Sequence, residues 1–237
     1  MPDLLLEIGL EEVPARMIAS AQAELLKRTL ALLTREQLIP ANPTAHAYST
    51  PRRLAVLVRD VLIQQPDITE ETTGPAVKIA FKDGQPTPAA EAFARKSGVA
   101  VTELRTISTP KGDYLAATTL KRGRTAAEVL AAELPKEIAA IYWAKNMYWR
   151  PGKPERFVRP VLWLVCLLGE DIVPVPFAGR TAGRATYGHR ILSSGEPFEI
   201  QTPSSYLAQL EGEYVLADVE LRRQKIRKAL DLSLIHI

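Results

Sequence analysis

Residues 3–9 read DLLLEIG, and residues 11–14 read EEVP. The first stretch is mostly apolar and predicts a short, largely buried strand. The acids and the proline that follow predict a helix start, because carboxylates favour the positive end of the helix dipole and proline suits the first turn. Apolar residues then recur at helical spacing over residues 15–33. The chain therefore opens as a strand followed by an amphipathic helix.

Further strands and helices follow without a strict alternation. Strands are expected at 44–50, 53–61, 114–120 and 172–177, and a polar loop at 64–74. Helices are expected at 87–98 and at 125–143, the second beginning with a T-x-x-E capping box and kinked or divided by Pro135. A short helix is expected to begin at Thr202-Pro203, and a last one to span 219–230 with Asp218 as its N-cap. Residues 157–168 fit either a helix face or a buried strand. This mixture predicts an α+β fold rather than a doubly wound sheet.

The chain is expected to form two or more small subdomains. We divide it into an N-terminal α+β segment (1–63), a middle α+β segment (64–150) and a basic segment typical of RNA-binding proteins (151–231). Residues 232–237, LSLIHI, match the translation of a common sequencing-library transposon adapter. We therefore expect a non-native tail on a truncated chain and give His236 no functional weight.

The composition is that of a globular protein, with 46% hydrophobic and 24% charged residues in 237. A single cysteine, Cys166, excludes a disulfide-stapled scaffold, and its apolar surroundings favour a buried, inert thiol. The longest apolar run, 161–168, is far shorter than the roughly 20 residues that cross a bilayer. No signal peptide is recognisable at the start of the chain. We expect a cytoplasmic protein that does not enter a membrane.

No catalytic or metal-binding motif is found in the sequence. The three histidines and one cysteine have no zinc-site spacing, and nucleophile-elbow, dinucleotide and P-loop patterns are missing. The acid pair Glu11-Glu12 is more simply a helix-start feature, and Glu70-Glu71 a solvated loop, than a general acid and base. We therefore predict no catalytic residue and no metal site.

The positive charge is concentrated in the last third of the chain. The whole chain carries a net charge of +3, and residues 150–190 contain seven basic residues against three acids. Within them, residues 178–190 read AGRTAGRATYGHR, in which glycines allow close backbone approach to a ligand and the cations match phosphate oxygens. The cations are Arg180, Arg184, His189 and Arg190. Equally, this stretch fits a surface loop whose arginines pair with carboxylates or face water.

A second cluster alternates aromatic and basic residues over 142–159. Unpaired nucleotides need such a surface, because bases stack on rings while phosphates meet cations. The candidates here are Trp149, Arg150, Arg156 and Arg159. Either tryptophan, Trp143 or Trp149, is individually better explained as a core anchor. Arg52-Arg53 forms a third, weaker patch.

Motifs spread along the chain resemble those of the β subunit of the heteromeric bacterial glycyl-tRNA synthetase. They are LLLEIGLEEVP (4–14), TPRRLAV (50–56), Gly74-Pro75, PTPAA (86–90) with Phe93, KNM (145–147) with Trp149, RFVRP (156–160) with WLV (163–165), and GRATYGHR (183–190). Leu10, Val13 and Ala185 depart mildly from the family's pattern. The motifs keep the family's order over residues 3–231. The resemblance implies a longer β subunit, of which this chain is the N-terminal part.

The resemblance also implies a function. The complex, with two α and two β subunits, joins glycine to tRNA(Gly) using ATP and Mg²⁺, which the α subunit binds. No cofactor is expected on this fragment, which would contribute tRNA binding and assembly and be inactive alone. Two alternatives remain open. The fragment is a scaffold that binds only the α subunit, with tRNA contacts in the missing C-terminal domains, or it is an independent enzyme with 178–190 as a phosphate loop.

Overall fold

The apolar stretch at the start of the chain forms the central strand of a five-stranded antiparallel sheet. The computed structural model describes residues 1–82, 85–110, 112–152 and 155–235. The order of strands is β10-β9-β1-β3-β2, with β1 at Leu4–Leu10, β2 at Ala45–Thr50, β3 at Arg53–Val58, β9 at Val161–Leu168 and β10 at Asp171–Ile172. Every residue of β1 is buried, which explains its nearly continuous apolar sequence. The ambiguous stretch 157–168 is resolved as a strand, since β9 pairs with β1 along almost its whole length.

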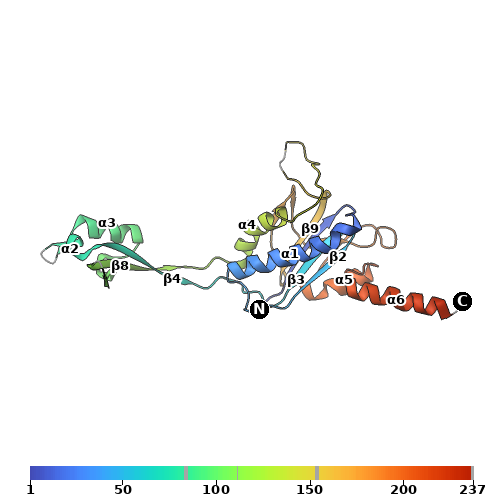
Figure 1. Ribbon diagram of the computed structural model, residues 1–237, viewed down its shortest axis with the longest axis horizontal. Helices are drawn as coiled ribbons and strands as arrows, with labels where there is room; N and C mark the ends of the chain where they lie inside the picture. Colours follow the sequence, from blue (N-terminus) through green and yellow to red (C-terminus); the bar gives the residue numbers. More distant parts are fainter. Residues whose placement is uncertain (83–84, 111, 153–154, 236–237) are drawn as a thin grey trace. The chain divides into compact units, whose positions relative to one another are not determined.

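Helices cover one face of this sheet, and a second apolar cluster covers the other. Leu4, Leu6 and Ile8 of β1 share a core with α1 (Ala15–Arg35) and α4 (Ala126–Ala139), and Figure 1 shows both helices on that face. Leu5 shares the opposite core with Tyr206 of α5 (Tyr206–Gly212). The alternation of side chains along a strand thus divides β1 between two cores. The last helix, α6, spans Val219–Ile235.

The expected helix starts are confirmed, but the ends and the role of Pro135 differ. The Thr125 side chain accepts a bond from the amide of Glu128 (3.2 Å), and the Glu128 carboxylate accepts one from the Thr125 amide (2.9 Å). The bonds that this carboxylate accepts from the Thr125 amide and from the Thr125 hydroxyl (2.8 Å) lower the pKa of Glu128. The helix runs through Pro135 undivided and ends at Ala139 instead of residue 143. At α6 the amide of Leu221 donates to Asp218 (3.0 Å), and the helix continues beyond residue 230.

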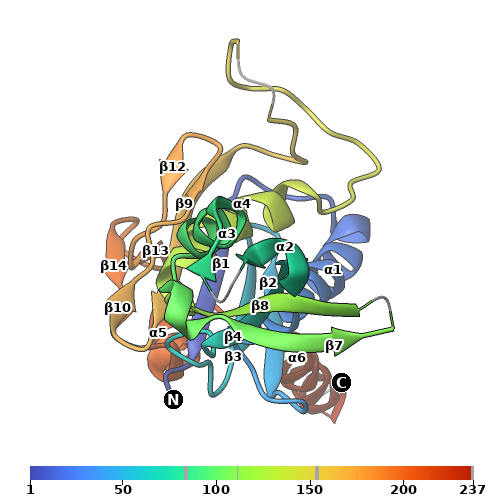
Figure 2. The same cartoon turned by 90° about the vertical axis from the view of Figure 1, so that its left-hand side faces the viewer.

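Short strands extend the unit beside β9. The expected strand at 172–177 is wrong as a single element, because Pro174 and Pro176 have no N–H to donate to a ladder. Two hairpins follow instead, β11 (Pro176–Phe177) with β12 (Arg180–Thr181), and β13 (Ala185–Tyr187) with β14 (Pro197–Glu199). A 3₁₀ turn at Pro203–Ser205 precedes α5. Figure 2 shows β12, β13 and β14 on one side of this unit with β9 and β10.

Residues 66–123 form a second compact unit with a small core of its own. Its sheet has the order β4-β8-β7, with β4 at Ile68–Ala76, β7 at Arg105–Thr109 and β8 at Gly112–Lys121. The remaining elements are α2 (Val77–Ala80), β5 (Phe81–Lys82), β6 (Gln85–Pro86), α3 (Pro88–Ser97) and a 3₁₀ turn at Val101–Glu103. Gly98 ends α3 with φ of 68°, as its position predicted.

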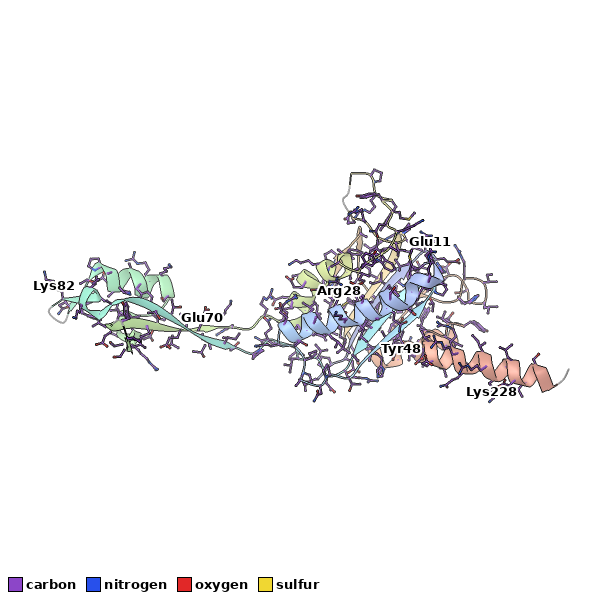
Figure 3. The ribbon with its side chains drawn as sticks, in the orientation of Figure 1. Glu11, Arg28, Tyr48, Glu70, Lys82 and Lys228 are labelled. Carbon is purple, nitrogen blue, oxygen red and sulfur yellow. The ribbon has the colours of Figure 1, made fainter. Side chains whose placement is uncertain are left out.

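The expected loop at 64–74 is wrong, because most of it belongs to β4. This strand pairs with β8 from Ile68 onward, although its residues up to Thr73 are exposed, including Glu70 (Figure 3). A strand without a buried face has no apolar alternation, so the sequence pattern could not reveal it. Gly74 is required locally, since a Cβ there would lie 2.5 Å from the Phe93 ring.

The two units divide the chain differently from the expected segments 1–63, 64–150 and 151–231. The first unit joins Met1–Gln65 with Arg124–Ile237, so the basic segment shares its unit with the N-terminal strand. The second unit corresponds to only part of the middle segment. The expected non-native tail, 232–237, begins inside α6, and His236 lies outside the described residues. Among the residues described, no helix is long and apolar enough to span a membrane.

Candidate nucleic-acid interface

The glycine- and arginine-rich stretch 178–190 is held against the edge of the main sheet. Gly183 donates to the carbonyl of Leu164 (3.0 Å) and accepts from the amide of Cys166 (3.1 Å). The strands β12 and β13 flank this contact. Cys166 itself is fully buried, and burial raises the pKa of its thiol to about 12, so the expected buried thiol is confirmed. A rigid strand therefore positions the chain that carries the cations.

The arginines of this stretch are at the surface and are not sealed by carboxylates. Arg180 is exposed, and Arg184 donates to the carbonyl of Glu170 (2.7 Å). Arg190 has a loose ion pair with Glu12 at 3.8 Å, in which both side chains are more than half exposed. A carbonyl partner leaves the guanidinium charge unneutralised, and an exposed pair contributes little. These three cations remain able to meet phosphate oxygens.

His189 holds the turn that follows. Its Nδ1 atom accepts hydrogen bonds from the amides of Ile191 (3.2 Å) and Leu192 (3.1 Å). An imidazole nitrogen that accepts bears no proton, which leaves Nε2 as the ring nitrogen that can donate. His189 therefore orders the turn with one nitrogen and can donate to a ligand with the other.

The aromatic and basic cluster at 142–159 contributes fewer unpaired arginines than the sequence suggests. Arg150 pairs with Glu155 at 2.8 Å, and its guanidinium packs so closely over Gly179 that a Cβ there would lie 2.7 Å away. Gly179 also has φ of 79°, a conformation that favours glycine. Arg159 is half-buried and donates to the carbonyl of Glu12 (3.0 Å). Since Glu12 also pairs with Arg190, the two clusters meet there.

The aromatic residues divide between core and surface. Trp143 is buried and packs edge-on against Phe157, with ring centroids 5.0 Å apart, as expected of a core anchor. Trp149 is partly buried against the same core. Tyr148 is 63% exposed, and the exposed Arg156 lies over its ring at 5.7 Å. The Tyr148–Arg156 pair thus presents a flat, cationic surface on which a base could stack.

The third patch, Arg52-Arg53, is largely not a surface feature. Arg53 is only 3% exposed, and its Nη1 atom lies 3.5 Å from the fully buried carboxylate of Glu7. Its Nη2 atom donates to the carbonyl of Tyr187. Arg52 is half-buried over the Trp163 ring at 5.7 Å. The expectation of a surface patch is therefore wrong for Arg53, because a charge this deep needs a counter-ion.

Glu7 is the structural residue that sequence reasoning missed. Its carboxylate accepts hydrogen bonds from Thr186 Oγ1 (2.5 Å), from the Trp163 indole and from the Tyr206 hydroxyl. Burial and the charge of Glu7 raise the pKa of Tyr206 well above its usual value. The network ties β13, which belongs to the arginine-rich stretch, to β1 and α5. The signal in the sequence was a lone carboxylate inside an otherwise apolar strand.

Among the described residues, no group of three or more His, Cys, Asp or Glu side chains is placed to hold a metal ion. Four of the predicted arginines fall into two sets. Arg159 and Arg190 converge at Glu12, and Arg150 packs over Gly179 next to Arg180. No hydrogen bond or ion pair in the described part of the chain joins the side chain of Arg156 or Arg184 to either set.

Comparison with known proteins identifies one family. The family model described as "Glycyl-tRNA synthetase beta subunit" matches residues 4–234. The glycine–tRNA ligase beta subunit of Acidobacterium capsulatum is 60% identical over 98% of this chain and 33% of its own length. Those of Moorella thermoacetica and Bacillus subtilis are 43% and 38% identical over 94% and 97% of this chain, and 32% and 33% of their own lengths. The chain therefore spans about a third of the curated relatives it matches.

Proposed function

The chain belongs to the glycyl-tRNA synthetase β subunit family, and from this we propose that it contributes a tRNA-binding surface to a glycine–tRNA ligase. In this proposal the α subunit binds ATP and Mg²⁺ and forms the bond between glycine and tRNA(Gly). The residues described here bind and orient the RNA. The assembly would be a cytoplasmic heterotetramer of two α and two β subunits, and this chain alone would be inactive.

One observation carries the proposal: the cations of the stretch 178–190 are exposed or bonded to backbone carbonyls rather than neutralised by buried carboxylates. Arg184 on a carbonyl and Arg190 in a loose, exposed pair keep their charge available. Such a surface suits a polyanion such as RNA that is recognised mainly through its phosphates and its shape rather than its bases.

The proposal is tested by measuring the affinity of the chain for a tRNA(Gly) transcript at increasing salt. Each phosphate contact contributes about 0.7 to 0.9 to the slope of log affinity against log salt. Arg184→Ala with Arg190→Ala should therefore weaken binding and reduce the slope by about 1.5. Arg227→Ala with Lys228→Ala, two exposed cations on α6 (Figure 3 labels Lys228), is the matched control.

Two results would contradict the proposal that this surface binds tRNA. If tRNA affinity does not change with salt, or the arginine pair behaves as the control pair does, the surface does not bind RNA. A chain that binds the isolated α subunit but no tRNA would instead be a protein scaffold. Mixing the chain with each partner separately distinguishes these outcomes.

A further inference from the structure

A cavity of about 550 Å³ opens beside the arginine-rich stretch in the first unit. Its walls come from five separate segments of the chain: the residues between β1 and α1, the β2–β3 turn, the turn after β13, the residues that follow α5, and the first turn of α6. The residues that matter here are Arg52, Arg190, Ile191, Tyr214, Leu216 and Arg222. Cavities of this volume hold small organic molecules, and a single nucleotide is of that size.

The polar part of the wall carries an excess of positive charge. Arg52, Arg190 and Arg222 line the cavity with one exposed acid, Glu12, while Arg53 is paired with buried Glu7. Arginine presents a planar fork that matches phosphate oxygens. The net positive charge of the wall and the guanidinium groups of Arg52 and Arg190 therefore favour an anion with several acceptor oxygens.

Arg222 is fixed in place before any ligand arrives. Its Nη1 atom donates to the carbonyl of Ser49 (2.9 Å) and to that of Leu216 (2.5 Å). Burial lowers the pKa of its guanidinium. Because carbonyl partners do not cancel its charge, Arg222 adds to the positive potential of the wall at no further ordering cost.

The apolar part of the wall includes a tyrosine in an uncommon backbone conformation. Tyr214 has φ of 60°, in the left-handed region that glycine usually occupies at a helix end, and its side chain is 61% exposed. A large side chain placed there at a conformational cost suggests a use for the ring. Leu216 lines the same wall, and Ile191, 82% exposed, lines it from the adjacent turn. A flat heterocycle would bury these surfaces, and aromatic rings are the usual partners of unstacked bases.

We propose that this cavity binds one unstacked nucleotide of the RNA, with its phosphate on Arg52 and Arg190 and its base against Tyr214. The inference rests on the proposed function, since the nucleotide belongs to the bound tRNA. His189, which also lines the cavity, can donate from Nε2 to the ribose or the base. The apolar wall is what distinguishes this site from a general phosphate-binding surface.

The test uses this chain with nucleoside 5′-monophosphates, inorganic phosphate and the tRNA(Gly) transcript as separate probes. Tyr214→Gly removes the ring while suiting the left-handed backbone, so the variant should fold. We expect it to weaken mononucleotide and tRNA binding about tenfold, with phosphate binding and the salt slope unchanged. Arg52→Gln should weaken binding of all three probes, and thermal unfolding verifies that it folds. Tyr142→Ser, at a tyrosine that is 75% exposed and does not line the cavity, should leave mononucleotide binding unaltered.

Each contrary result has a definite meaning. Equal binding of phosphate and mononucleotides, unaffected by Tyr214→Gly, would show an anion site without base recognition and overturn the proposal. Salt-dependent tRNA binding that neither cavity variant alters would overturn it while leaving the proposed function intact. Loss of α-subunit binding alone in these variants would show that the cavity receives a protein segment. If no tRNA binds at all, the proposed function fails first.

Discussion

Replacing Glu7 with glutamine tests whether one buried carboxylate holds the second face of the main sheet together. Glu7 is fully buried, Arg53 is 3% exposed, and three side-chain donors point at the carboxylate. Glutamine keeps the shape of the side chain but removes the charge. It also turns one acceptor into a donor among groups that already donate. The guanidinium of Arg53 would then be buried without its counter-ion.

The expected cost follows from these contacts. Removing one member of a buried ion pair lowers the free energy of unfolding by about 3–5 kcal/mol. Hydrogen bonds to a charged group contribute about 1.5–3 kcal/mol each, but they share the same carboxylate and do not add. We therefore expect Glu7→Gln to cost about 4 kcal/mol. Arg53→Met alone should cost a similar amount, because it leaves the carboxylate uncompensated.

The double variant isolates the interaction. Glu7→Gln with Arg53→Met buries no unpaired charge, so its cost should be smaller than the sum of the two single costs by at least about 2 kcal/mol. Urea unfolding followed by tryptophan fluorescence suits the measurement, since all three tryptophans lie in the first unit. Glu220→Gln, from an exposed ion pair with Arg223, is the control and should cost less than about 0.5 kcal/mol.

A loss below about 1 kcal/mol for Glu7→Gln, or strictly additive costs in the cycle, would show that the carboxylate and Arg53 do not depend on each other. In that case the backbone hydrogen bonds to β9 and apolar packing, rather than the buried carboxylate, would hold β13 and the arginine-rich stretch.

Three further predictions concern packing, ionisation and capping. Gly9→Ala would place a Cβ 1.9 Å from the Trp163 ring, so overpacking should lower the free energy of unfolding by about 1–3 kcal/mol, seen as a lower melting temperature. Cys166 should resist thiol reagents in the native state. Because burial raises its pKa to about 12, the folded chain keeps a proton that the unfolded chain loses above about pH 9, so this thiol should lower the stability by up to about 1.4 kcal/mol per pH unit from there to pH 12. Cys166→Ala should make the fall in stability over this pH range less steep by that amount. Thr125→Ala should cost about 1 kcal/mol by denaturant unfolding, since the amide of Glu128 loses its cap.

Local patterns were sufficient for most helices and for the buried strands. The stripe of α1, the capping box of α4 and the glycine at the end of α3 are each set by neighbours within a few residues. The strands β4 and β7 were missed for the opposite reason. Their side chains are mostly exposed, and only pairing with β8 makes them strands. Backbone hydrogen bonding to a distant segment leaves little trace in a single sequence.

The arginines show the same limit at the level of the candidate site. Arg53 and Arg190 both stand close to apolar and aromatic residues in the sequence, and a count of charges treats them alike. What separates them is a carboxylate 46 residues before Arg53, which the fold of β1 against β3 brings into contact. Arg53 is thereby committed to the core, whereas Arg190 faces an exposed acid at 3.8 Å. The number of basic residues in the sequence is therefore only an upper limit on the number of cations that can bind phosphate. Those that can are the ones whose partner in the structure is a backbone carbonyl or a loosely paired, exposed carboxylate.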